Sequence, residues 1–268
     1  MPWVETNGIS VHYELAGAGP CLVLMHEMGG TLDSWDGIFP ALSKRLRALR
    51  YDQRGSGLSE KPRRPLNTEL LVDDLEAVLQ GLELAPPYHL VTVAAATMQA
   101  LIYMTRHPGS IASFVFCNPF TGADPSRLSA LDERASLAER EGMRAAVPVT
   151  LDKSWPPQHG DRAAYARYRA RYLAQDPVCF AAMNRAIGNP NVTHLGKKIA
   201  NPTMVVAGRF DQVRLPAATE QFARTIPGAR FEVIDAVHMM PAQAPGALLP
   251  LLEDFFGAQS GAAAAAAH

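Results

Sequence analysis

The chain has 268 residues, of which 48% are hydrophobic and 19% are charged, and its formal net charge is −1. This profile is typical of a globular protein that is long enough to bury a large core. A charge close to zero gives no electrostatic reason to expect binding to nucleic acid or to an anionic membrane. No apolar run reaches the roughly 20 residues that a membrane-spanning helix needs.

The cysteines and the chain ends bear on location. Cys21, Cys117 and Cys179 are far apart in apolar surroundings, which favours buried free thiols. The first residues, MPWVETNGIS, lack the charged-then-apolar layout of a signal peptide. We therefore expect a cytoplasmic protein. Residues 258–268 end in the low-complexity run GAAAAAAH, which we interpret as a disordered tail or a cloning remnant.

Short apolar runs alternate with helical patterns along the chain. Residues 2–16 alternate around Asn7-Gly8, which predicts a hairpin of two antiparallel strands. Further strands are predicted from apolar runs at 21–26, 46–52, 88–93, 113–119, 202–208 and 229–234. Helical spacing of apolar residues predicts helices over 34–46, 68–84, 96–107, 216–226 and 246–256.

This alternation predicts an α/β fold: a mostly parallel eight-stranded sheet, opened by two antiparallel strands and covered by helices on both faces. Residues 122–197 are rich in Ala and Arg and contain no buried-strand run. We expect them to form a helical cap inserted into a core of residues 1–121 and 198–257. Ligands of such sheets bind at the carboxyl ends of the strands, so the loops after the strands are the candidate site.

The strand predicted over 88–93 runs into the next helix without a loop. Such a turn is typical of a nucleophile elbow, whose G-x-S-x-G motif presents one reactive side chain. Here the five residues are Thr92-Val93-Ala94-Ala95-Ala96, which keep the small side chains but lack both glycines and the serine. An ordinary alanine-rich helix start is the alternative interpretation.

Two titratable residues follow the last two predicted strands. Asp211 lies in the loop after 202–208, and His238 in the loop after 229–234. Each alone is more typical of a turn or a structural role. Together they follow the order nucleophile, acid, histidine, and the 27 positions between them leave room for one helix and one strand. We therefore predict that His238, oriented by Asp211, acts as a general base.

The loop after strand 21–26 is the candidate oxyanion loop. A negatively charged oxygen would be held by two backbone N–H groups, one from Ala95 and the other from Met28 or Glu27. Gly29-Gly30 either let this loop approach the ligand closely or form a plain turn. Glu27 is unusual here, and its carboxylate is expected either to act as a second acid or base or to point into solvent.

At these residues the chain resembles the α/β-hydrolase superfamily over nearly its full length, and within it the 3-oxoadipate enol-lactonase branch. The resemblance implies that Asp211 and His238 are the acid and histidine of that family's triad. Arg134 matches an arginine that could pair with a substrate carboxylate, unless it is solvated or ion-paired. Trp155 is a further substrate-binding candidate, unless it belongs to the cap core. The similar stretches are VLMHEMGGTLDSWD, LRYDQRGSGLS, SIASFVFCNP, KSWPP, NPTMVVAGRFDQVRLP and FEVIDAVH.

The resemblance also sets the register of the elbow. In this fold a proline commonly ends the elbow helix fourteen residues after the nucleophile, with a small residue at the sixth. Pro108 and Ala100 therefore place the nucleophile position at Ala94, where the lactonases have serine. YDQRGSG with an alanine at the elbow is similar to the aminoacrylate hydrolase family, whose members can carry alanine there.

Three interpretations of Ala94 follow, since a methyl group cannot attack a carbonyl. The preferred one is a hydrolase of small esters, lactones or enamines in which His238 activates water; lyase or cofactor-free oxygen chemistry would also fit. The second is a serine enzyme inactivated by replacement with alanine, although Thr92 and Ala96 also break the motif. The third is a binding protein without turnover. We expect a small-molecule substrate, no metal and no nucleotide cofactor.

Overall fold

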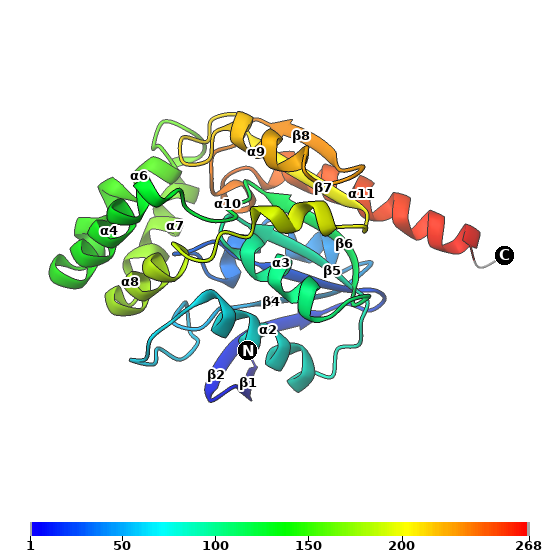
Figure 1. The fold of residues 1–268 in the computed structure, drawn as a ribbon, viewed down its shortest axis with the longest axis horizontal. Helices are drawn as coiled ribbons and strands as arrows, with labels where there is room; N and C mark the ends of the chain where they lie inside the picture. The colour runs from blue at the N-terminus through cyan, green and yellow to red at the C-terminus, as the bar shows by residue number, and fades with distance from the viewer. Residues whose placement is uncertain (1, 267–268) are drawn as a thin grey trace.

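The computed structural model describes residues 2–266, with side chains for residues 2–259. Within this range eight strands form one sheet in the order β1-β2-β4-β3-β5-β6-β7-β8 (Figure 1). The β1–β2 and β2–β4 pairs are antiparallel and the other neighbours are parallel, which confirms the predicted sheet. The strands are β1 (Trp3–Thr6), β2 (Ile9–Ala16), β3 (Cys21–Met25), β4 (Arg47–Tyr51), β5 (Tyr88–Val93), β6 (Ile111–Cys117), β7 (Thr203–Gly208) and β8 (Arg230–Ile234).

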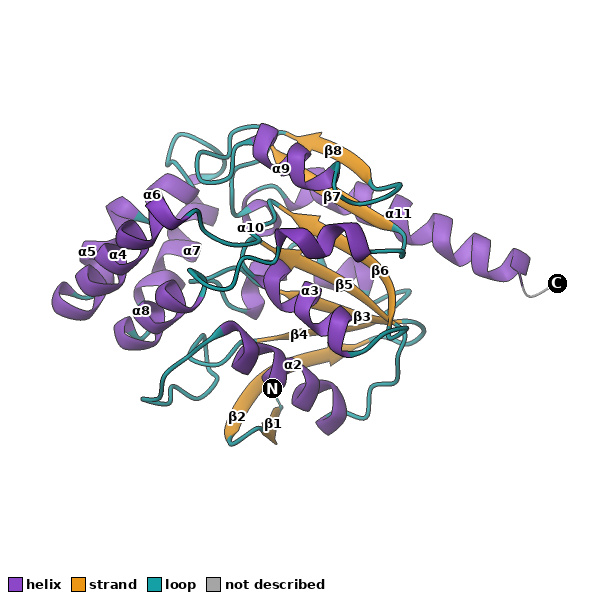
Figure 2. Cartoon of the chain, in the orientation of Figure 1, coloured by secondary structure: helices purple, strands orange, loops and turns teal. Residues whose placement is uncertain are grey.

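Helices cover both faces of the sheet (Figure 2), and this explains the composition of its central strands. Every residue of β3, β5 and β7 is buried, as expected for parallel strands with helices on either side. Side chains of α2, α3 and α9 pack on one face, and those of α1 and α11 on the other. The core helices are α1 (Phe39–Leu42), α2 (Thr68–Gly81), α3 (Ala96–Arg106), α9 (Pro216–Ala223), α10 (Met240–Gln243) and α11 (Pro245–Ala266).

Two predicted segments differ from the structure. In place of one helix over 34–46 there is a short 3-10 helix η1 (Leu32–Trp35) followed by α1. Pro40 has no N–H with which to continue a helix from upstream. The tail that we expected to be disordered from residue 258 continues α11 to Ala266, because alanine has the highest helix propensity. Residues 267–268 lie outside the described residues.

The insert between β6 and β7 is helical and lies at one end of the sheet (Figure 1). It has its own apolar cluster, which includes Trp155, Tyr168 and Tyr172 and also takes in Val237 and Met239 from the loop after β8. The cap is therefore packed directly on a loop at the carboxyl ends of the strands. Its elements are η2 (Pro125–Arg127), α4 (Leu128–Glu141), α5 (Met143–Ala146), η3 (Val147–Val149), α6 (Leu151–Ser154), α7 (Arg162–Leu173), α8 (Pro177–Ala186) and η4 (Thr193–Lys198).

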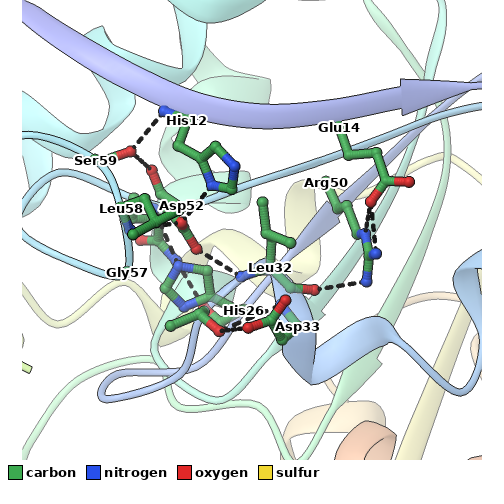
Figure 3. Close-up of polar contacts among 12 residues, drawn as sticks. His12, Glu14, His26, Leu32, Asp33, Arg50, Asp52, Gly57, Leu58 and Ser59 are labelled. Carbon is green, nitrogen blue, oxygen red and sulfur yellow. Dashed lines mark hydrogen bonds and ion pairs between the residues drawn. The ribbon is translucent and has the colours of Figure 1, made fainter. Parts of the chain in front are cut away.

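A buried carboxylate joins the loops that follow β3 and β4 (Figure 3). One oxygen of Asp52 accepts a hydrogen bond from the backbone N–H of Leu32 at 2.8 Å. The other lies 2.9 Å from the backbone nitrogen of Leu58 and 2.7 Å from Nδ1 of His12. The Ser59 hydroxyl donates to the backbone carbonyl of Asp52. This network holds the start of η1, and with it the candidate oxyanion loop, against the sheet.

Replacing Asp52 tests how much this network stabilises the fold. Asp52→Ala leaves the buried N–H of Leu32, the buried His12 ring and the part-buried N–H of Leu58 without their acceptor, and a buried group left unpaired costs about 1–3 kcal/mol. We expect the free energy of unfolding in urea to fall by at least ~3 kcal/mol. The control is Asp235→Asn, because Asp235 is exposed beside Arg209 and such changes stay within about 0.5 kcal/mol. Equal stabilities of the two variants would contradict this account.

Candidate active site

The elbow between β5 and α3 contains a strained residue. Only Ala94 and Ala95 separate the strand from the helix, and Ala94 has φ +50°. This left-handed conformation costs a residue with a Cβ roughly 1–2 kcal/mol. The Ala94 N–H donates to the Cys117 carbonyl, and the N–H of Phe120 donates to the Ala94 carbonyl, both at 3.0 Å. The strained tip is the residue that the sequence places at the nucleophile position.

His238 and Asp211 form a buried pair. Nδ1 of His238 lies 2.6 Å from Oδ2 of Asp211. The second oxygen of Asp211 accepts the backbone N–H groups of Val213 at 2.7 Å and Arg214 at 2.9 Å. The carboxylate favours the histidine tautomer that is protonated on Nδ1, so Nε2 is the basic nitrogen. The structure therefore brings together the acid and the histidine that the sequence predicts.

The surroundings of His238 set its basicity. Burial alone would lower the pKa of His238, but it is outweighed by the charge of Asp211 and the hydrogen bond to it. The charge of Glu27 acts in the same direction as Asp211, and that of Arg214 opposes it. The net result is a pKa raised above the ordinary histidine value. His238 is thus a stronger base than a free imidazole.

Asn118 links the ends of β7 and of the loop that carries His238. The sequence did not predict Asn118 as a residue of the site. Its amide nitrogen donates to the carbonyls of Val237 and His238, both at 3.1 Å, and its amide oxygen accepts the N–H of Gly208 at 2.8 Å. Cys117, the last residue of β6, and Phe120 in the same loop as Asn118 bond to the backbone of Ala94. The sequence signal was an asparagine directly after a buried strand, since asparagine tolerates the φ of +46° observed here.

The candidate oxyanion loop is rigidly held. Nδ1 of His26 lies 2.7 Å from the Glu27 carbonyl, and Nε2 accepts the backbone N–H of Gln53 at 3.0 Å. Gly29 has φ +77°, and a Cβ there would lie 2.5 Å from the ring of Tyr172. Only glycine fits this position, so Gly29 provides both a turn and a close approach to the cap.

The candidate oxyanion donors have no protein acceptor. Among the described residues, no group accepts a hydrogen bond from the N–H of Ala95, Met28 or Glu27. Ala95 follows the elbow tip, and Met28 and Glu27 lie in the loop after β3, as in an oxyanion hole. Met28 and Glu27 are the two alternatives that the sequence gives for the second donor.

Glu27 does not point into solvent, so that expectation was wrong. Its side chain is buried, with 1% exposure. Oε1 accepts the Ser34 hydroxyl at 2.7 Å and the Tyr168 hydroxyl of the cap at 2.6 Å. Oε2 is also buried, and no group of the described residues donates to it.

The two cap candidates differ in their surroundings. Arg134 on α4 is half-buried; no acid of the described residues pairs with it, and its Nε is buried without a partner. Burial lowers its pKa, with a smaller opposite effect of Tyr172. Trp155 is completely buried among cap aromatics, and its indole N–H donates to the His159 carbonyl at 2.7 Å. Trp155 thus lies in the cap core, the alternative that the sequence left open.

The described residues contain no candidate metal site, no candidate membrane-spanning helix and no disulfide bond. Among the described residues, no three His, Cys, Asp or Glu side chains are grouped so that they could hold a metal ion. No helix in that part of the chain is long and apolar enough to cross a membrane. Cys21, Cys117 and Cys179 are buried free thiols, as the sequence predicts.

Comparison with known proteins identifies the class of protein. Residues 20–245 match the family described as the alpha/beta hydrolase fold. The chain belongs to this family of hydrolase enzymes.

An enol-lactonase and a putative carbamate hydrolase are among the proteins that resemble this chain, and a probable oxidoreductase matches part of it. The enol-lactonase of Burkholderia xenovorans is 27% identical with a TM-score of 0.88, covering 96% of this chain and all (100%) of that one. A putative carbamate hydrolase, RutD of Caulobacter vibrioides, is 28% identical over 84% of this chain and 86% of its own length. A probable oxidoreductase, EphD of Mycobacterium tuberculosis, is 34% identical over 40% of this chain, but the match spans only 19% of EphD. The likeness to the enol-lactonase supports the branch that the sequence indicates.

The strain at the elbow gives a prediction for Ala94→Gly. Glycine adopts positive φ without a Cβ clash, so this variant should be more stable to urea by about 0.5–1 kcal/mol. Its turnover should match that of the parent, because the methyl group performs no chemistry. The control is Ala100→Gly in the middle of α3, where glycine should destabilise by about 0.5–1 kcal/mol. Destabilisation by Ala94→Gly would show that the tip is not strained.

Proposed function

We propose that this protein hydrolyses a small ester-like or lactone-like substrate by direct attack of water, without a covalent intermediate. The observation that carries this proposal is a buried His238–Asp211 pair, 2.6 Å apart, linked through Asn118 and the end of β6 to an elbow whose tip is only a methyl group. Because Ala94 has no nucleophilic atom, the base acts on a water molecule instead. The N–H groups of Ala95 and Met28 hold the developing oxyanion.

The reaction proceeds in two proton-balanced steps. The water oxygen forms a bond to the substrate carbonyl carbon while one water proton moves to Nε2 of His238. The carbonyl oxygen becomes an oxyanion, and Asp211 stabilises the imidazolium. The tetrahedral intermediate then collapses, the bond to the leaving oxygen breaks, and the imidazolium returns its proton to that oxygen. The products are a carboxylic acid and an alcohol or enol.

The substrate range is argued from the relatives and the cap. The enol-lactonase and the putative carbamate hydrolase are both named for substrates with a carbonyl next to a heteroatom. Arg134 would pair with an anionic group of the substrate, since no protein acid among the described residues occupies its guanidinium. Glu27 is a further contact, and Trp155 supports the pocket from the cap core. A cytoplasmic location fits the three free thiols.

Replacing the base tests this function directly. His238→Ala should lower kcat for p-nitrophenyl acetate by about 10²–10⁴-fold, because general-base catalysis contributes that much. His194→Ala is the matched control, because His194 is exposed in η4 of the cap. This variant should leave kcat unchanged. In the parent, kcat/KM should rise with pH through a pKa above 6.5. Full activity of His238→Ala would refute the role of His238 as the general base.

Restoring a hydroxyl distinguishes direct attack from an acyl-enzyme. Ala94→Ser should change kcat by less than about tenfold and leave no acyl adduct in intact-protein mass spectra, because the flanking glycines are also absent. A gain of ~10³-fold or more, comparable to the loss on removing a triad nucleophile, would instead identify a serine-dependent enzyme. Calorimetric binding without turnover in either form would indicate a binding protein. Release of products other than those of hydrolysis would indicate lyase or oxygen chemistry.

A further inference from the structure

Glu27 is a buried acid next to the candidate oxyanion hole, and neither the fold nor the triad pattern requires it there. It follows His26, whose ring holds the Glu27 carbonyl, and it precedes Met28, whose N–H is a candidate oxyanion donor. Glutamate is almost never fully buried unless it is paired. Glu27 is buried, and among the described residues its hydrogen-bond donors are the hydroxyls of Ser34 and Tyr168, with no ion pair to a Lys or Arg.

The hydrogen bonds of Glu27 are unevenly distributed between its oxygens. A carboxylate offers about four acceptor sites. The hydroxyl groups of Ser34 and Tyr168 both donate to Oε1, while no described group donates to Oε2. A buried carboxylate oxygen without a donor is destabilising, and natural proteins retain such groups mainly where they function.

The carboxylate lies in the same packed region as the loop that carries His238: Tyr168, which donates to Glu27, belongs to the apolar cluster that also contains Met28, Val237 and Met239. Its negative charge contributes to raising the pKa of His238, and it also raises the pKa of Cys117, although burial is the larger cause there. Cys117 is the residue whose carbonyl holds the N–H of Ala94. The other charged groups that act on His238 are Asp211 and Arg214, both from the loop after β7. Glu27 thus acts on the imidazole from a different loop, the one after β3.

We propose that Oε2 of Glu27 binds the attacking water, accepting one of its hydrogens while Nε2 of His238 accepts the other. This inference rests on the proposed hydrolysis by water. A serine hydroxyl has one hydrogen and is oriented by its covalent bond, so a single base suffices. A water has two hydrogens and no covalent tether, and the Ala94 methyl offers it no hydrogen bond. Two acceptors are needed to aim its lone pair at the carbonyl carbon.

Both protons of the attacking water are accounted for in this step. One water proton passes to His238 as the O–C bond forms, and the second stays on the water oxygen, hydrogen-bonded to Glu27, until it becomes the product's carboxyl proton. Glu27 remains a carboxylate throughout. Its charge opposes the oxyanion at the neighbouring N–H groups, but it favours the imidazolium that forms at the same moment. The arrangement therefore suits a reaction that is limited by activation of water.

Glu27→Gln tests the role of the acceptor. The amide oxygen still accepts from Ser34 and Tyr168, while an NH₂ group replaces Oε2 and can no longer accept a hydrogen. We expect kcat for p-nitrophenyl acetate to fall by about 10²–10³-fold with little change in KM. Loss of the negative charge lowers the pKa of His238, so the acid limb of kcat/KM should move to lower pH. Unchanged kcat and an unchanged acid limb would overturn the inference.

Tyr168→Phe is the matched control, because it removes only a donor to Oε1. Its kcat should fall by less than about tenfold, and the acid limb should stay in place. If Tyr168→Phe reproduces the full loss seen in Glu27→Gln, then Glu27 merely anchors the cap and the inference is wrong.

A measurement without turnover separates this inference from the proposed function. In a crystal structure of the substrate-free protein, one ordered water should bond to both Oε2 of Glu27 and Nε2 of His238, and Glu27→Gln should lose it. An NMR titration should show a lower pKa of His238 in Glu27→Gln. A structure in which Oε2 and Nε2 share no water overturns the inference whatever the kinetics. If the parent hydrolyses no ester, lactone or carbamate probe, the proposed function fails instead.

Discussion

The arrangement of the site depends on the hydrogen bonds of one short loop, the one that follows β6. Asn118 is bonded to the ends of two other structural segments, accepting the Gly208 N–H and donating to the carbonyls of Val237 and His238. Cys117 at the end of β6 and Phe120 in the loop bond to the N–H and the carbonyl of Ala94. Ala94 and Asn118 both have positive φ, and these bonds compensate the strain at two adjacent strand ends. Parallel strands bring the elbow and the histidine loop to one edge of the sheet, and these bonds join the two there.

A site built in this way can lose its nucleophile and keep its remaining chemistry. The two candidate oxyanion donors are backbone groups, so no side-chain substitution removes them. The His238–Asp211 pair is held by Asp211's own backbone contacts and by Asn118, none of which involves the side chain at position 94. Under the proposed mechanism the attacking atom is a water oxygen in place of a tethered hydroxyl, so its orientation depends on the surrounding acceptors.

Most of the core could be predicted because parallel strands are continuous apolar runs, and residues directly after such runs must meet at one edge. This placed Asp211, His238 and Ala94 correctly relative to their strands. The break between η1 and α1 was not predicted, because the helical spacing of apolar residues continues across Pro40. The burial of Glu27 was unpredictable, because it depends on Tyr168, 141 positions away in the sequence. The burial of Trp155 likewise depends on packing in the folded cap, where its ring contacts those of Tyr165 and Tyr168.

The cap and the chemistry are joined by direct bonds. The backbone N–H of His238 donates to the Ser154 carbonyl at 3.1 Å, and the Tyr168 hydroxyl donates to Glu27. A Cβ at Gly29 would overlap the ring of Tyr172, so this close contact joins the oxyanion loop to α7. A change in the cap at these contacts therefore acts on the segments that hold the base and the loop carboxylate. Under the proposed function, this is how the cap influences the groups that react with the substrate.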